Sequence, residues 1–393
     1  MANVLELIKR EMQLNNFKLE CPTCISKKVI LGELSYCLHP NVHEKQVEPY
    51  GAVFCGRSSP RSLAVRLVTV ADSEIEMSRQ FADGRRSFLV YLATSNPKLG
   101  IYDIALGDEY RLLQLAEEMQ GIVLQRLHTG VVKLIQNGEI YSIRGRMWSH
   151  KESIDKALNR ILAYLENVPI AEILSILRGF ITLCYYYLSP EGVGATLVWL
   201  LNDKGVAAIQ SGRAVGLASL DLSVRDADTY PLIRHILEHQ DGATSVLSSG
   251  KLECTGVHLT FSEKAAKAVL ETHGTRHTSA ARFTYDHPEA IAFVVSQDGP
   301  VTIFSDGANI AELPIGAAAE EATRLEKVAP AKKSDISHAS FVKKCKSCGR
   351  SIRIEQVTVI GWKDPEQVNC PVCGQELYSA MCFNLEAYPI KKL

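Results

Sequence analysis

A glycine, an arginine, a histidine and two threonines follow one another in the stretch Gly274-Thr275-Arg276-His277-Thr278. The stretch comes directly after a run that predicts a helix, and free backbone N–H groups at a helix start or tight turn attract anions. An arginine can hold a phosphate through a fork of donors, to which the histidine and the hydroxyls can add. Residues 274–278 therefore predict a phosphate site, although an ordinary surface loop can carry the same residue types.

Two other short segments carry residues that suit the same chemistry. Asp241-Gly242-Ala243 lies between a predicted helix and a predicted strand. A carboxylate there could hold a metal ion or take a proton from a hydroxyl, and the glycine would let a ligand approach the backbone. Ser296 and Asp298 follow a predicted buried strand and add a hydroxyl and an acid. Each segment alone also fits an ordinary turn.

Four cysteines near the C-terminus form two Cys-x-x-Cys-Gly turns, Cys345 with Cys348 and Cys370 with Cys373. Each turn can place two thiolates on one ion, and the glycine allows the positive φ that such a turn needs. Because strand-like sequence joins the two turns, the spacing predicts a zinc ribbon with Zn²⁺ in a structural role. Ribbons of this kind often bind nucleic acid or protein, so we expect either as a partner, and the few flanking positive charges do not decide between them.

A looser group of potential metal ligands lies near the N-terminus, formed by Cys21, Cys24, Cys37 and His39. Thiolates and an imidazole are the ligands of structural zinc, so a second zinc site is one interpretation of this group. Free thiols are an equal alternative.

The composition indicates a soluble globular protein of two or three domains. The chain has 393 residues, of which 46% are hydrophobic and 22% charged, and its formal net charge is -1. No overall field therefore favours nucleic acid or membrane, and no secretion signal is evident, so the expected location is the cytoplasm. The most apolar run, residues 171–188, contains Arg178 and is short for a membrane span. We expect a packed helix there, with a membrane segment as a lesser alternative.

Residues 1–148 predict a small α/β domain. Alternating apolar and polar residues indicate strands over 64–70 and 87–93, and residues 109–128 have the pattern of an amphipathic helix. Two further alternating runs meet at Asn137-Gly138, which predicts a hairpin with a type I′ turn.

Residues 149–170 predict a helix that connects this domain to the next, with Ser149 as its N-cap and Glu152 completing a capping box. In residues 171–312 strands and helices then alternate without regular βαβ repetition, which favours a mixed twisted sheet with helices packed on it. The continuous apolar run at 194–203 is typical of a strand buried on both faces.

The second domain contains a predicted helix over 262–274, with Ser262 as N-cap and Gly274 just past its C-terminal end. A hairpin turned at Asp298-Gly299 follows. Beyond it the chain becomes rich in Ala, Glu, Lys and Pro, which predicts a linker before the ribbon. The resulting domain boundaries are 1–148, 149–170, 171–312, 313–340 and 341–393.

In their order and spacing, these motifs resemble the diadenylate cyclase domain, the nucleotide-binding domain of the DNA-integrity-scanning protein and its relatives. That family is marked by Asp-Gly-Ala, by Gly-Thr-Arg-His about thirty residues further on, and by an apolar strand that ends in Val-Val-Ser. Here these motifs are Asp241–Ala243, Gly274–His277 and Val294–Ser296. The resemblance covers roughly residues 170–310, and the preceding α/β domain looks like the sensor domain of sensor-linked members.

The resemblance implies an enzyme that joins two ATP molecules into cyclic di-AMP, with release of two pyrophosphates and use of Mg²⁺ or Mn²⁺. It implies that Asp241 lies near the metal ion and the ribose 3′-hydroxyl, and that Arg276 and His277 act on the phosphates. The other nucleotide-binding residues that it implies are Gly242, Ala243, Gly274, Thr275, Thr278 and Ser296. Because each 3′-oxygen attacks the opposite nucleotide, two domains must face each other, which implies a homo-oligomer.

The sequence departs from the family pattern at three places. Thr278 stands where many members have arginine, Gln297-Asp298 stands where an acid pair is common, and Gln240 stands where a histidine often precedes the aspartate. Two alternatives therefore stay open. One is a weakly active or inactive protein that senses nucleotides or binds nucleic acid, and the other is a cyclase that makes another cyclic nucleotide.

Overall fold

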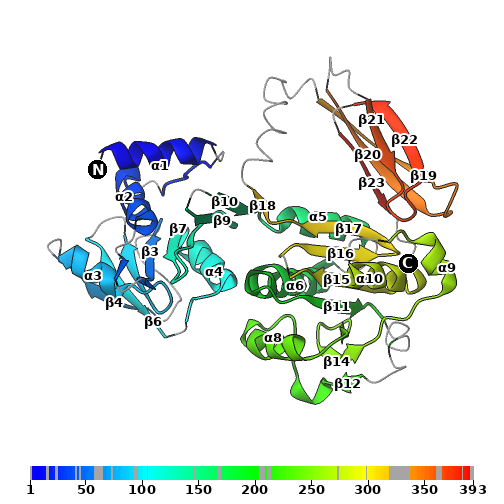
Figure 1. The fold of residues 1–393 in the computed structure, drawn as a ribbon, viewed down its shortest axis with the longest axis horizontal. Coiled ribbons are helices and arrows are strands. Elements are labelled where there is room, and N and C mark those ends of the chain that lie inside the picture. The colour runs from blue at the N-terminus through cyan, green and yellow to red at the C-terminus, as the bar shows by residue number, and fades with distance from the viewer. Residues whose placement is uncertain are drawn as a thin grey trace. The chain divides into compact units, whose positions relative to one another are not determined.

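The computed structural model describes most of the chain (Figure 1). The described residues fall into two compact units, Met1–Ser153 with Ile315–Val328, and Ile154–Pro314 with Ala329–Leu393. The described ranges are 2–14, 17–22, 25–39, 42–43, 46–56, 65–71, 74–92, 96–103, 105–145, 147–165, 170–202, 209, 214–271, 274–297, 299–317, 336–359, 365–382 and 384–389. Within these ranges, no helix has the length and apolar character needed to cross a membrane.

The first unit is an α/β arrangement, as the sequence predicts. Its strands are β1 (Val42–His43), β2 (Gln46–Val47), β3 (Tyr50–Phe54), β4 (Val65–Thr69), β5 (Ser87–Tyr91), β6 (Lys98–Tyr102), β7 (Ile122–Arg126), β8 (Val132–Gln136), β9 (Glu139–Arg144), β10 (Met147–Lys151) and β18 (Gly316–Ala317). Its helices are α1 (Ala2–Leu14), α2 (Lys27–Leu38), α3 (Ile75–Phe81) and α4 (Glu109–Met119). One mixed sheet has the strand order β18-β10-β9-β8-β7-β3-β5-β6-β4, and β1 pairs with β2 separately.

The centre of this sheet is buried because helices pack on it. Strands β3 and β7 are buried along their whole length, and both α2 and α4 contact them. The hairpin predicted at Asn137-Gly138 is confirmed: β8 pairs antiparallel with β9, and the two turn residues have φ values of 52° and 77°. Both values are positive, as a type I′ turn requires.

Two predictions about helices in residues 1–170 are wrong. The helix predicted over 109–128 ends at Met119, because Gln120 adopts a left-handed conformation and Gly121 lies directly against the carbonyl oxygen of Phe54. The apolar residues after Gly121 form β7, which pairs with β3. Ser149 caps no helix: it lies in β10, paired with β9, and helix α5 begins only at Asp155. Over so short a run, apolar periodicity fits a strand as well as a helix. Pairing with a neighbouring strand then determines which of the two forms.

The second unit contains a mixed seven-stranded sheet, which confirms the predicted fold class. Its strands are β11 (Ala195–Leu200), β12 (Val215–Gly216), β13 (Ala243–Val246), β14 (Leu252–Val257), β15 (Ala290–Val295), β16 (Val301–Ser305) and β17 (Ala308–Leu313). The sheet order is β12-β14-β13-β11-β15-β16-β17, and among these pairs β11 and β13 run parallel. Its helices are α5 (Asp155–Tyr164), α6 (Ile170–Ile181), the π-helical η2 (Thr182–Leu188), the short η3 (Ser189–Glu191), η4 (Ala218–Leu220) and η5 (Ala227–Thr229), then α8 (Tyr230–His239), α9 (Glu263–Ala268) and α10 (Thr275–Asp286).

The apolar run at 171–188 packs on this sheet, as predicted. It forms α6 and η2, and the ring of Phe180 stacks on that of Phe293 in β15 at 4.5 Å between centroids. Trp199 in β11 lies 5.6 Å from the same Phe180 ring. Strands β11 and β15 are fully buried, which agrees with the continuous apolar sequence of β11.

The helix predicted over 262–274 is shorter than expected. Ser262 does cap α9, since its hydroxyl accepts a hydrogen bond from the Ala265 N–H at 3.1 Å, but α9 ends at Ala268. Gly274 instead stands immediately before α10 with φ 97°, so it begins the next helix rather than ending α9. The sequence also predicts a hairpin turn at Asp298-Gly299. Asp298 lies outside the described residues.

The ribbon completes the second unit. Its strands are β19 (Ile336–Lys344), β20 (Ser351–Val359), β21 (Pro365–Asn369), β22 (Glu376–Met381) and β23 (Asn384–Pro389). β20 lies between β19 and β23 in one antiparallel sheet, and β21 pairs with β22 in another. Strand β19 begins at Ile336, ahead of the predicted ribbon boundary at 341. The predicted linker, 313–340, contains β18, which pairs with β10 of the first unit, and its residues 318–335 lie outside the described part of the chain.

Candidate active site

The structure brings two of the predicted catalytic residues, Asp241 and Arg276, to one cavity of about 450 Å³ in the second unit. The cavity has a mainly polar lining. Its lining residues are Glu191, Gly192, Val193, Gly194, Leu237, Glu238, His239, Gln240, Asp241, Arg276 and Gln297.

The sheet topology explains why these residues meet. The N-terminal end of β11 lies beside the C-terminal end of β15, with Ala195 opposite Val295. β13 runs parallel to β11, with Leu197 opposite Thr244, so the start of β13 lies at the same edge. Residues 192–194, Asp241 and Gln297 each stand just outside these three strand ends. Segments far apart in sequence therefore reach one edge of one sheet.

Asp241 occupies a turn between α8 and β13 that depends on the glycine after it. Gly242 has φ 96°, and a Cβ there would lie 3.0 Å from both Gly256 C and Val257 O, so a side chain would strain this turn. Asp241 Oδ1 accepts a hydrogen bond from the Gly242 N–H at 2.9 Å, and Oδ2 takes no part in that bond. The carboxylate is exposed, so it can reach a ligand in the cavity.

Arg276 reaches the cavity from the second residue of α10 by passing close to Gly194. A Cβ on Gly194 would collide with Arg276 Nη1 and would lie 2.8 Å from Gln297 Cγ. The glycine therefore makes room for the guanidinium at the N-terminal end of β11. The need for a small residue at position 194 arises only when Arg276 and Gln297 are packed beside it, so the sequence alone does not reveal the role of Gly194.

Replacing Gly194 with alanine is expected to displace Arg276, the predicted phosphate-binding residue, and to reduce nucleotide turnover about tenfold or more, because small shifts of a catalytic group are costly. Gly216 offers a matched control, since a Cβ there meets nothing within 4 Å. Steady-state kinetics and circular dichroism of Gly194→Ala and Gly216→Ala would check this. Equal turnover in the two variants would contradict the role given to Gly194.

The N-terminus of α10 carries the remaining residues of the Gly-Thr-Arg-His-Thr motif. Thr275 and Arg276 are exposed in the first turn, whose N–H groups can attract an anion. The Thr278 hydroxyl donates a hydrogen bond to the Gly274 carbonyl at 3.1 Å, and the Ser279 hydroxyl donates one to the Arg276 carbonyl, also at 3.1 Å. Both hydroxyls thus support the start of the helix.

His277 is half-buried rather than displayed in the cavity. Its ring lies edge-on to the Phe304 ring at 5.9 Å between centroids. Burial, assisted by the neighbouring Arg276 charge, lowers the pKa of His277 below its ordinary value of 6.5, although Glu312 opposes this shift. His277 is therefore neutral at pH 7 in the ligand-free chain, where it can donate one hydrogen bond but adds no positive charge.

The lowered pKa of His277 gives a prediction for its NMR titration. Its imidazole resonance should titrate with a midpoint below 6.5 in the absence of nucleotide. Since the folded-state pKa is the lower one, protonation favours the unfolded chain, and this residue should reduce stability as the pH falls below 6.5. Comparison with the spectrum of His277→Gln identifies the resonance. A midpoint at or above 6.5 would show that the ring is not desolvated as described.

The other predicted residues lie near the cavity without lining it. Ala243 is the first residue of β13 and is buried, and Ser296 follows β15 and opens the turn to β16. The Ser296 N–H donates to the Pro300 carbonyl and its carbonyl accepts from the Gly299 N–H, each at 3.0 Å. The next residue, Gln297, lines the cavity together with Arg276.

Two glutamates in the lining were missed by the sequence analysis. Glu191 and Glu238 come from η3 and α8, and Arg234 joins them, at 3.2 Å to Glu191 and 2.7 Å to Glu238. This ion-pair group links the loop before β11 to the helix before Asp241. Charged residues at helical spacing are usually a solvated surface, so no local signal distinguishes these two.

Comparison with known families matches two parts of the chain. Residues 183–309 match the family described as DisA bacterial checkpoint controller nucleotide-binding, abbreviated DAC, and residues 7–152 match the probable sensor domain DACNK. The chain belongs to the DisA-type diadenylate cyclase family. It combines a cyclase domain with an N-terminal sensor domain, and no curated protein matches it.

The cyclase domain offers a divalent ion one carboxylate from its signature motif, that of Asp241. Among the described residues, Asp241 belongs to no group of three or more acidic, histidine or cysteine side chains that are spaced to hold a metal ion. Cyclases of this family use divalent metal ions, and an ion bound through one carboxylate and ligand phosphates is the usual arrangement in phosphoryl-transfer enzymes. The exposed carboxylate is therefore compatible with a metal that arrives with the nucleotide.

The four ribbon cysteines form a metal-ligand cluster. Their sulfur atoms lie within 4.8 Å of one another, with 3.5 Å between Cys345 and Cys373 and 3.7 Å between Cys348 and Cys370. Sulfurs at about 2.3 Å from a tetrahedral zinc ion are roughly 3.8 Å apart, so the geometry suits zinc. Burial opposes ionisation of the Cys345 thiol, but hydrogen bonds from the backbone N–H groups of Cys348 and Ser347 and from the Cys373 and Cys348 thiols together outweigh it, and its pKa is lowered to about 7.

The two cysteine turns have the same backbone. The Cys345 N–H donates to the Arg350 carbonyl at 2.8 Å, and the Cys370 N–H donates to the Gln375 carbonyl at 2.7 Å. Gly349 and Gly374 have φ values of 73° and 74°, as predicted for the glycine that closes each turn.

The possible N-terminal zinc site is not assembled in the described residues. Cys37 is buried in the core of the sensor domain at the end of α2, where burial raises the pKa of its thiol, and His39 is exposed. Neither joins Cys21 in a group with metal-ligand spacing. The fourth residue, Cys24, lies outside the described part of the chain.

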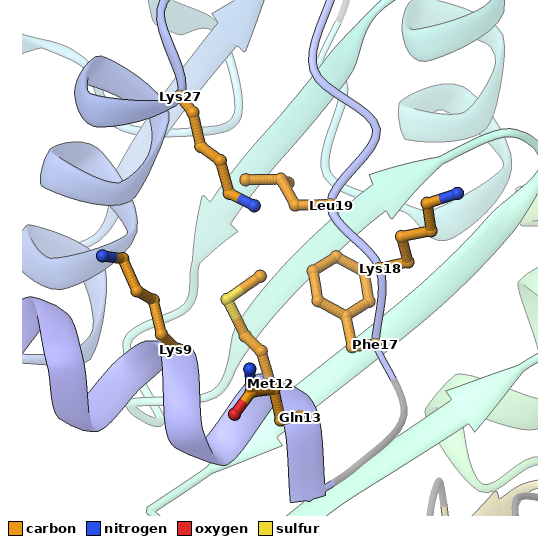
Figure 2. Close-up of a pocket in the computed structure, with 7 residues that line it drawn as sticks. All are labelled: Lys9, Met12, Gln13, Phe17, Lys18, Leu19 and Lys27. Carbon is orange, nitrogen blue, oxygen red and sulfur yellow. The ribbon is translucent and has the colours of Figure 1, made fainter.

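The sensor domain contains a cavity of about 320 Å³ between α1, the chain at residues 17–19 and the first residue of α2. Met12, Phe17 and Leu19 form an apolar floor (Figure 2). Figure 2 shows Lys27 pointing into the cavity and Lys18 pointing away from it. The basic residues at its rim therefore do not converge on one point.

Proposed function

We propose that this chain joins two molecules of ATP into cyclic di-AMP and releases two pyrophosphates. The observation that carries the proposal is the cavity shared by Asp241 and Arg276 in a domain of the DAC family. In each half of the reaction a ribose 3′-oxygen forms a bond to the α-phosphorus of the other nucleotide. The bond from that phosphorus to pyrophosphate breaks, and the hydroxyl proton leaves. Two such steps close the ring.

The residues suit this chemistry because phosphoryl transfer needs in-line positioning and stabilisation of charge more than covalent help. Asp241, exposed at the strand edge, would hold the 3′-hydroxyl in line and accept its proton directly or through a bound ion. Mg²⁺ or Mn²⁺, when bound, would neutralise phosphate charge and lower the pKa of the hydroxyl. Arg276 would hold the phosphate oxygens through two parallel hydrogen bonds.

The start of α10 would hold the rest of the phosphate chain. The N–H groups of Thr275 and its neighbours lie at the N-terminal end of a 12-residue helix, where an anion is favoured. Thr278 would act through the helix, since its hydroxyl is bonded to Gly274. His277, neutral and half-buried, would supply a hydrogen-bond donor.

A second copy of the chain would complete the site. Asp241, Arg276 and Gln297 are all exposed in the single chain, whereas the reaction requires two nucleotides, each presented by its own domain. We therefore propose a homo-oligomer in which two cyclase domains face each other across their cavities. Such an enzyme should lose specific activity when diluted below the dissociation constant of the assembly.

We further propose that the ribbon cysteines bind Zn²⁺ in a structural role, supported by the mutual distances of the four sulfurs.

A second candidate, nucleotide binding with little or no turnover, is favoured by the charge of the cavity. Among the residues that line it, Arg276 is the single arginine or lysine, whereas Glu191, Glu238 and Asp241 are acids. Thr278 adds no charge at the position where many family members have arginine. A slow enzyme, or one that only senses nucleotides, would follow from this balance.

The proposal can be tested by following pyrophosphate release. The full chain incubated with ATP and Mg²⁺ or Mn²⁺ should release one pyrophosphate for each ATP consumed, and the specific activity should rise with protein concentration. Release of inorganic phosphate instead would indicate hydrolysis. Binding of ATP without any release, at all protein concentrations and with either metal ion, would favour the second candidate.

A further inference from the structure

The first cysteine turn of the ribbon contacts the cyclase domain through Arg350. This residue directly follows Gly349, and its carbonyl accepts the hydrogen bond from Cys345 that closes the turn. Its guanidinium lies 3.2 Å from the carboxylate of Asp306 and donates to the Tyr285 carbonyl, also at 3.2 Å. Its central carbon lies 4.7 Å above the centroid of the Tyr285 ring. One side chain thus makes three contacts with the cyclase domain.

The carboxylate that Arg350 contacts is deeply buried. Asp306, in the turn between β16 and β17, is 2% exposed and also accepts a hydrogen bond from the Tyr164 hydroxyl. The next residue, Gly307, donates its N–H to the Thr284 hydroxyl of α10 at 3.3 Å. A buried carboxylate needs a cationic partner, and truncating that partner leaves an uncompensated charge. The turn at Asp306 therefore joins the ribbon to α10.

The second cysteine turn contacts the cyclase domain at another point. Gly374, whose N–H is bonded to the Cys370 carbonyl at 2.8 Å, lies against the side chain of Leu270. A Cβ on Gly374 would come within 2.7 Å of Leu270 Cδ1, so the two surfaces are in close contact. Buried residues of the ribbon and of the cyclase domain belong to one apolar cluster.

These contacts bracket the phosphate-binding segment. Leu270 precedes Gly274 by four residues, and Tyr285 lies in the last turn of α10. Between them stand Arg276 and His277. Since α10 is stiff and closely packed, the contact at Tyr285 in its last turn, together with the contact at Leu270 ahead of its start, constrains where its first turn presents Arg276.

We propose that the metal-loaded ribbon clamps residues 270–285 and that Arg350 is a positioning residue for Arg276. The effect of the clamp on turnover rests on the proposed cyclase function, whereas the contacts that form the clamp do not. The ribbon's first partner is then the cyclase domain of its own chain.

Metal occupancy controls the clamp because the contact residues are part of the ligand turns. Small ribbons are held in shape by their ion, and the turns lose their geometry when it is removed. Arg350 and Gly374 would then leave Asp306 and Leu270. α10 would keep its packing on β15 and β16 but would lose the ribbon contacts made near its two ends. Through the ribbon, the turnover of the proposed cyclase reaction would depend on zinc.

Hydrogen exchange of the full-length chain tests the clamp directly. Zinc is removed with a chelator, its release is measured with a chromogenic indicator, and the protein is then desalted and given fresh Mg²⁺. We expect amide exchange in residues 275–286 to accelerate about tenfold, while exchange in β11 and β15 stays slow. Turnover of ATP should fall about tenfold or more, with a smaller change in KM, because a misplaced group costs transition-state stabilisation.

A variant with zinc retained separates positioning from loss of the ribbon fold. Arg350→Gln should keep the zinc content of the native chain and still show faster exchange in residues 275–286. Arg350→Lys should restore part of the protection, since it keeps the charge beside Asp306 but loses the fork. Lys346→Gln is the matched control, because Lys346 is an exposed cation in the same turn.

The outcomes are distinct for the clamp and for the proposed function. Unchanged exchange in residues 275–286 after zinc removal and in Arg350→Gln would overturn the clamp, whether or not cyclic di-AMP is made. Faster exchange in the same region for Lys346→Gln would also overturn it, since any change in the ribbon would then suffice. Faster exchange in the zinc-free chain and in Arg350→Gln, with no dinucleotide from any sample, would support the clamp and count against the proposed function.

Discussion

Replacing Asp241 with asparagine is expected to reduce turnover of ATP about 1,000-fold, because the amide can neither accept the 3′-hydroxyl proton nor hold a divalent ion in the same way. Its exposed position and the retained turn at Gly242 predict little effect on folding. Binding of ATP, which rests on the phosphate contacts, should change by no more than about threefold. Rapid-quench assays and equilibrium binding measure the two quantities separately.

A matched control for this variant is Asp221→Asn. Asp221 has a side chain that is 77% exposed and pairs with Lys251 on the surface, so its replacement should leave turnover within about twofold. An Asp241→Asn enzyme that retains most of its turnover would remove Asp241 from the reaction.

Replacing Arg276 with lysine is expected to reduce turnover about 100-fold. Lysine keeps the positive charge but lacks the planar fork that can bind two phosphate oxygens at once, and Gly194 has left room for a guanidinium rather than for an ammonium. Unlike Asp241→Asn, this variant should also weaken ATP binding. Steady-state kinetics together with calorimetric titration distinguish the two patterns.

Arg178→Lys supplies the control for Arg276→Lys. Arg178 lies on α6, its side chain is 54% exposed, and it does not line the cavity. Full turnover in Arg276→Lys would mean that the α-phosphate is held elsewhere, with the N-terminus of α10 the next group to examine.

The motifs of the cyclase domain were readable in the sequence because each is a short contiguous segment. Asp241 and Arg276 were predicted from the residue types in such segments, and the structure places both on one cavity. Gly194 and Glu191 were not found, since their part in the site depends on the register between Ala195 and Val295. Pairing of residues 100 positions apart leaves no trace in the local pattern.

The errors in the predicted elements have a similar origin. The run after Gly121 is apolar enough for a helix, but pairing with β3 makes it a strand. Ser149 has the sequence of a cap, yet pairing of β10 with β9 outweighs the roughly 1 kcal/mol that a cap supplies. Likewise, Arg350 was one of the few positive charges that flank the cysteine turns, and its partner Asp306 became evident only in the folded unit.

The central claim is that two cyclase domains make cyclic di-AMP from ATP, and the identity of the product tests it most directly. The full-length chain, with zinc retained, would be incubated with ATP and Mg²⁺ or Mn²⁺, and the products identified by mass spectrometry. We expect cyclic di-AMP with two pyrophosphates per molecule, and no product from 3′-deoxy-ATP, which lacks the attacking hydroxyl. ATP that is bound but unchanged with either metal, or a product that does not depend on the 3′-hydroxyl, would contradict the account.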